Sequence, residues 1–97
     1  MDNTTQELLN NLTEKFKLIK GQSLQPVVVN QAEYGLEMIG AKVFQGTELE
    51  ILPALKDLFY DIEEMSADTF VRKIAGDGID LIIDFCRLHK VGVLVSD

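Results

Sequence analysis

The stretch from Thr47 to Met65 constrains the fold of this chain most, because its apolar and acidic residues separate onto two sides of a helix. The apolar side covers roughly 140° at 100° per residue and consists of Ile51, Leu52, Leu55, Leu58, Phe59, Ile62 and Met65. The opposite side is a stripe roughly 60° wide, formed by Glu50, Asp57, Asp61 and Glu64. This pattern predicts a helix packed by its apolar side. Because proline is tolerated only in the first turn, Pro53 predicts a start a few residues after Thr47.

Two further helices are predicted in the first half of the chain. The first spans Thr5–Lys20, because Thr4 and Glu7 have the spacing of a capping box and leucine, phenylalanine and isoleucine follow at helical intervals. The second starts from a similar signature at Asn30 and ends before Gly46.

The end of the chain predicts a short helix and a longer one. Ser66 is expected to cap a helix over Ala67–Ala75, and the glycines of Gly76–Gly78 predict a turn. The last helix, Gly78–His89, is apolar around most of its circumference, through Ile79, Leu81, Ile82, Ile83, Phe85, Cys86 and Leu88. A helix of this kind is buried, either at the centre of a bundle or against a partner.

The order of these elements predicts a mainly α fold, a compact bundle of four to five helices. Val27–Val29 and Val91–Val95 are rich in β-branched residues, so the prediction allows two very short strands. An α+β fold with an N-terminal hairpin over residues 14–30 is the alternative, because Lys17 to Gln25 brackets a turn-like KGQS. Neither a linker nor an internal repeat is expected, so residues 1–97 are predicted to form one domain.

Charge narrows the classes of partner. Nine Lys and Arg against sixteen Asp and Glu give a net charge of −7. Residues 46–97 hold eleven of these acids against five bases, whereas residues 1–45 hold five acids against four bases. Nucleic acids and anionic membranes are bound by clusters of Lys and Arg, so neither is an expected partner. A basic protein partner is compatible with the charge.

Cysteine usage and hydropathy suggest a cytoplasmic protein. A single cysteine, Cys86, excludes an intrachain disulfide and fits a reducing compartment. The N-terminal residues have no signal-peptide pattern, and no apolar run approaches the ~18 residues of a membrane span.

No residue pattern points to catalysis, to a metal or to a cofactor, so the chain is not expected to be an enzyme. Cys86 and His89 lie one helical turn apart, but a zinc site needs three or four ligands and the chain has one Cys and one His. Asp77, Asp80 and Asp84 share a stripe with Arg87, which favours helix capping and surface pairing over a metal site.

The main functional hypothesis is a protein-interaction or assembly module that forms a homodimer. The residues expected in self-association are Ile79, Ile82, Ile83, Phe85 and Cys86. The first alternative is an acidic inhibitor that occupies the basic, nucleic-acid-binding surface of a partner. The acidic face in question would comprise Glu50, Asp57, Asp61, Glu64, Asp77, Asp80 and Asp84. The second alternative is a small-ligand-binding domain with a cavity between helices.

Overall fold

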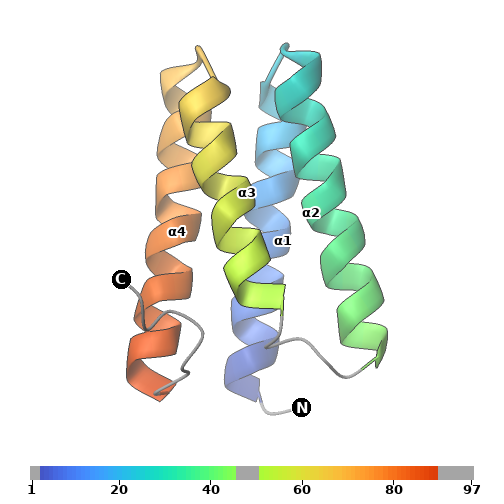
Figure 1. The fold of residues 1–97 in the computed structure, drawn as a ribbon, viewed down its shortest axis with the longest axis vertical. Helices are drawn as coiled ribbons and strands as arrows, with labels where there is room; N and C mark the ends of the chain where they lie inside the picture. Colours follow the sequence, from blue (N-terminus) through green and yellow to red (C-terminus); the bar gives the residue numbers. More distant parts are fainter. Residues whose placement is uncertain (1–2, 46–50, 90–97) are drawn as a thin grey trace.

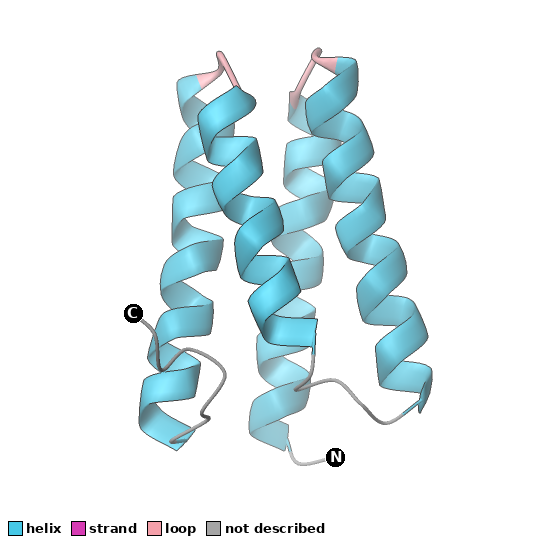
Figure 2. Cartoon of the chain, in the orientation of Figure 1, coloured by secondary structure: helices cyan, strands magenta, loops and turns pink. Residues whose placement is uncertain are grey.

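The fold is a bundle of four antiparallel helices, seen in a computed structural model that describes residues 3–45 and 51–89. The helices are α1 (Asn3–Gln22), α2 (Pro26–Gln45), α3 (Leu52–Met65) and α4 (Thr69–His89). Each neighbour in the ring α1–α2–α3–α4 packs against the next, and α4 closes the ring against α1. Both short turns, α1–α2 and α3–α4, lie at the same end of the bundle (Figure 1). The described residues contain helices and no strand (Figure 2), which confirms the mainly α prediction.

All four helices contribute to one hydrophobic core, and two phenylalanine rings meet within it. Phe16 of α1 and Phe59 of α3 are fully buried and stacked, with ring centroids 4.3 Å apart and planes inclined by 11°. Glycines of the other two helices approach these rings. A Cβ added to Gly35 of α2 would lie 2.5 Å from Cζ of Phe16, and one added to Gly78 of α4 would lie 2.7 Å from Cζ of Phe59. The two glycines therefore make room for the stack.

The two short turns use the same backbone device. Each starts with a buried serine, whose N–H donates to the carbonyl of the isoleucine four residues earlier at 2.9 Å. The hydroxyl oxygen of Ser23 accepts the N–H of Gln25, and that of Ser66 accepts the N–H of Asp68, both at 3.1 Å. Because these bonds satisfy backbone groups at the helix ends, each turn needs only three residues.

The side chain of Gln25 ties one turn to the other. Its Nε2 donates to the carbonyl of Met65 at 3.0 Å, and its Oε1 accepts the N–H of Ala67 at 2.7 Å. Asp68 instead caps α4, with Oδ1 accepting the N–H of Phe70 at 2.8 Å. The cap of this helix is thus Asp68, and the prediction that Ser66 would cap it was wrong.

Glycine signals in α4 were misread as a turn. The helix runs without a break from Thr69 to His89, so the predicted turn at Gly76–Gly78 and the separate helix Ala67–Ala75 do not exist. A glycine inside a helix costs about 1 kcal/mol relative to alanine. At Gly78 a Cβ would collide with Phe59, so packing in the core requires the glycine there.

The strand and hairpin predictions for the first half were also wrong. Val27–Val29 lies in the first turns of α2, which starts at Pro26, a residue suited to the first position of a helix. Residues 14–22 belong to α1, which excludes the hairpin over 14–30. The helix already includes Asn3, so Thr4 is not its cap. Val91–Val95 lies outside the described residues.

The prediction from Pro53 is confirmed. Helix α3 begins at Leu52, with proline in its first turn, rather than at Thr47. Five of the apolar residues predicted for this helix are fully or nearly fully buried in the core. They are Leu52, Leu55, Leu58, Phe59 and Ile62.

Candidate functional site

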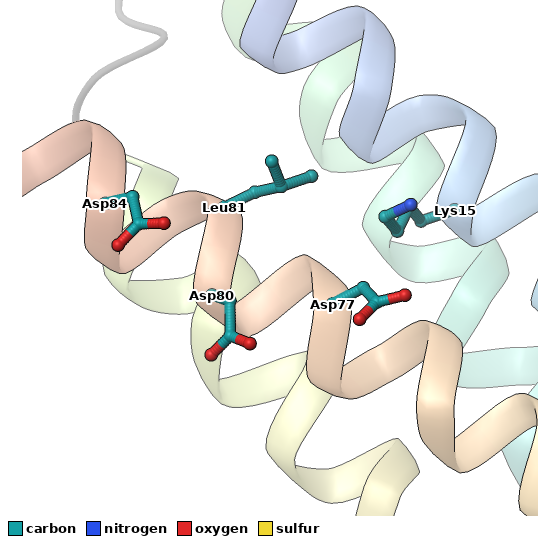
Figure 3. A pocket seen from close by; sticks show the side chains of 5 residues that line it. All are labelled: Lys15, Asp77, Asp80, Leu81 and Asp84. Carbon is teal, nitrogen blue, oxygen red and sulfur yellow. The ribbon is translucent and has the colours of Figure 1, made fainter.

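Three aspartates of α4 line a surface pocket against α1. Asp77, Asp80 and Asp84 are exposed and recur at three- and four-residue spacing, which places them on one side of the helix. Leu81 of α4 and Lys15 of α1 complete the lining, around a volume of about 330 Å³. Figure 3 shows the carboxylates along α4, with Lys15 entering the view from α1. We call these five residues the acidic groove.

The composition of the acidic groove suits a cationic side chain. Three carboxylates and one ammonium group line the groove, so it has an excess of negative charge, and Leu81 supplies an apolar wall. Lysine and arginine combine a cationic head with an aliphatic stem that packs on such a wall. Within the described part of the chain, no three His, Cys, Asp or Glu side chains are grouped so as to hold a metal ion.

The acidic groove contains only three of the seven residues predicted for an acidic face. Asp57, Asp61 and Glu64 are exposed along α3, whereas the acidic groove is lined from α1 and α4. Glu50 lies outside the described residues. The pocket thus groups the aspartates of α4 with Lys15 of α1, and the sequence could not indicate this grouping because it depends on how the helices pack.

The residues predicted for self-association face the core of their own bundle. Ile79, Ile82, Phe85 and Cys86 are buried, and Ile83 is half-buried. The apolar side chains of α4 from Ile79 to Cys86 pack in or against the core that α4 forms with its neighbouring helices, whereas Leu88 is 80% exposed. A dimer built on these five side chains would have to open the bundle, so they do not provide a ready surface for a partner.

An apolar depression at the turn end of the bundle was not predicted. It has a volume of about 430 Å³ and is lined by Gln22, Ser23, Leu24, Gln25, Ala67 and Asp68. Leu24 is 97% exposed, although it sits in a turn held by hydrogen bonds. Val27 and Phe70 are each about half exposed in the first turns of α2 and α4. The sequence signal that could have indicated an exposed apolar site was Leu24, a large apolar residue between polar ones. No sequence signal indicated that Gln25 joins the two turns by hydrogen bonds.

Cys86 is nearly fully buried, and burial raises the pKa of its thiol above 9.0, an effect partly opposed by the positive charge of Lys56. Because the thiolate is the reactive form, Cys86 should react slowly with a disulfide reagent in the folded protein and rapidly after denaturation. Because the folded state favours the neutral thiol, burial of Cys86 stabilises the fold fully below about pH 9. This stabilisation is lost as the pH rises through the folded-state pKa of the thiol. Thiol-labelling kinetics with and without denaturant test this, with Cys86→Ala as the blank. Equal rates in both conditions would contradict the buried position.

Comparisons with protein-family models, curated proteins and solved structures find no match for this chain. No helix in the described part of the chain is both long and apolar enough to cross a membrane. Function must therefore be argued from the surfaces described above.

Proposed function

We propose that this chain acts by binding another protein, and that the docking face is the turn end of the bundle. The observation that carries this proposal is the 97% exposure of Leu24 beside a depression lined by both turns. Exposed apolar groups that cluster around a depression are typical of protein-interaction sites. Val27 and Phe70, in the first turns of α2 and α4, add exposed apolar area next to the two turns.

The rigidity of this end supports the same proposal. Gln25 joins the two turns through hydrogen bonds to Met65 and Ala67, and the serine hydroxyls brace each turn internally. Binding through a preorganised surface loses less conformational entropy than binding through a flexible loop. A protruding leucine on such a base can enter a pocket of the partner as an anchor.

A second candidate is an inhibitor that binds a basic partner through the acidic groove. It is supported by the excess of carboxylates over ammonium groups around the 330 Å³ pocket. This binding would weaken steeply with salt, because exposed charges are screened over about 10 Å at 0.1 M salt.

Partner capture with matched variants tests both proposals. Protein captured from the source cell on the wild-type chain is identified and purified, and its Kd is measured for each variant at low and high salt. Docking at the turn end predicts that Leu24→Ser weakens binding at least about tenfold, the effect of a modest anchor residue. Leu88→Ser, which changes a leucine that is 80% exposed in α4, is the control and should bind like the wild type.

The two candidates give opposite results. If Leu24→Ser binds normally while Asp77→Asn, Asp80→Asn and Asp84→Asn together abolish a salt-sensitive interaction, the acidic groove is the docking site. If Leu24→Ser and Leu88→Ser weaken binding equally, the turn end is not the docking face.

A further inference from the structure

The two halves of the chain match each other at an offset of 43 residues. Eleven pairs of positions are identical at this offset: Thr4 and Thr47, Glu7 and Glu50, Leu9 and Leu52, Leu12 and Leu55, Phe16 and Phe59, Ile19 and Ile62, Ser23 and Ser66, Val28 and Val71, Ala32 and Ala75, Gly35 and Gly78, and Ile39 and Ile82. Any helical hairpin needs apolar residues at core positions. The matched serines, phenylalanines, alanines and glycines go beyond that requirement. The sequence expectation of no internal repeat was therefore wrong.

The same offset relates the contacts within the two hairpins. Gly35 closely approaches Phe16 as Gly78 approaches Phe59. Lys20 and Glu33 form an ion pair at 3.4 Å, and at the equivalent positions a Cβ on Gly76 would lie 3.1 Å from Oε2 of Glu63. The serine hydrogen bonds in the two turns also have equal lengths. The α1–α2 and α3–α4 hairpins are thus built on one plan.

The phenylalanine stack shows how the two hairpins are paired. In a two-fold arrangement, a residue meets its own equivalent only where the axis passes. Phe16 and Phe59 are equivalent positions and stack on each other. A two-fold rotation that exchanges α1 with α3 and α2 with α4 also converts the α1–α4 contact into the α3–α2 contact, and both contacts are present. The bundle therefore has an approximate two-fold axis running between the two rings.

The outer positions of the hairpins do not match. Lys17 corresponds to Tyr60, Tyr34 to Asp77 and Leu24 to Ala67, and most of the excess negative charge lies in the second half. Nine of the eleven matched pairs lie at buried positions, whereas the acidic groove and the exposed residues of the turn end differ between the halves. The inner face is thus the common feature of the two hairpins.

We infer that the chain is a tandem duplication of one helical hairpin, and that the inner face of this hairpin is a self-complementary docking surface whose occupant is another copy of the same hairpin, from its own chain or from a second copy of this chain. Within one chain, a short connection gives an effective concentration on the order of millimolar. The closed monomer therefore dominates at micromolar concentration. When closure is prevented, two chains exchange hairpins and form the same interface between them.

Chimeras of native length test the self-complementarity. In one, residues 52–88 are replaced by residues 9–45 with the buried leucine kept at position 58, and in the other, residues 9–45 are replaced by residues 52–88. Both keep the stacked phenylalanines and their glycines in register, so both should be monomeric, helical by circular dichroism and cooperative in thermal unfolding. The control replaces residues 52–88 by residues 8–44. This shift of one residue rotates the core pattern by 100° and should abolish cooperative unfolding. Chimeras no more cooperative than the control would overturn the inference.

Preventing closure tests docking between chains without changing either hairpin. Deletion of residues 46–50 joins Gln45 at the end of α2 directly to Ile51, which leaves α3 too little chain to lie antiparallel to α2 in the same molecule. The deleted chain should have twice the monomer mass by light scattering at micromolar concentration, with helical content and cooperative unfolding retained. A helical monomer, or aggregates without a defined dimer, would contradict exchange between chains.

Discussion

Replacing Phe59 with alanine is expected to lower the free energy of unfolding by about 3–5 kcal/mol, the range measured for buried aromatic residues. The side chain is fully buried, so its removal loses apolar transfer energy and leaves a cavity between tightly packed helices. It also removes the stacking partner of Phe16, whose centroid lies 4.3 Å away. Urea denaturation followed by circular dichroism measures the change.

A matched control and a double-mutant cycle separate the stack from general hydrophobic loss. Phe70→Ala changes a half-exposed phenylalanine on α4 and should alter stability by no more than about 1 kcal/mol. Phe16→Ala and Phe59→Ala together should cost less than the sum of the single changes by roughly 0.5–1.5 kcal/mol, the energy of an aromatic pair. Additive effects would show that the two rings do not stabilise each other. Equal losses for Phe59→Ala and Phe70→Ala would contradict the central position of Phe59.

Glycine-to-alanine changes should have opposite signs at two positions within helices. Gly78→Ala is expected to destabilise the bundle by about 1–3 kcal/mol, because overpacking outweighs the gain in helix propensity. The new Cβ would lie 2.7–2.8 Å from the buried ring of Phe59, which is stacked on Phe16 and has no room to retreat. Gly40→Ala has open space around its Cβ and should stabilise the protein by up to about 1 kcal/mol.

Thermal unfolding of both variants, with denaturant titration for the free energies, checks this contrast. Gly35→Ala provides a second test of the same effect, since its new Cβ would collide with Phe16 as the Cβ at position 78 would collide with Phe59. We expect Gly35→Ala and Gly78→Ala to behave alike. Stabilisation by all three alanines would mean that helix propensity, and not ring packing, governs these positions.

The elements best predicted from sequence were those with local signals. The apolar side of α3 was identified residue by residue, and Pro53 correctly delayed its start, because periodicity and proline geometry act within a few residues. The failures occurred where local preference and packing disagree. Val27–Val29 prefers strands by composition, yet burial of Val28 against the core favours the helix.

The candidate sites depended more strongly on tertiary structure. The exposure of Asp77, Asp80 and Asp84 followed from helix periodicity, but their place in one pocket with Lys15 required α1 to pack beside α4. Burial of Ile79, Ile82, Phe85 and Cys86 within their own bundle could not be distinguished from burial against a partner by sequence pattern, because both produce the same apolar circumference.

By itself the sequence determined that this chain forms packed amphipathic helices and that its second half is acidic. The tertiary structure decided that α4 continues through Gly76 and Gly78, that the aspartates of α4 line a pocket with Lys15 of α1, and that Phe16 stacks on Phe59. The physical reason is the range of the interactions. Helix periodicity and turn chemistry act over a few residues, whereas the stack joins positions 43 residues apart, and only the packed bundle brings them together.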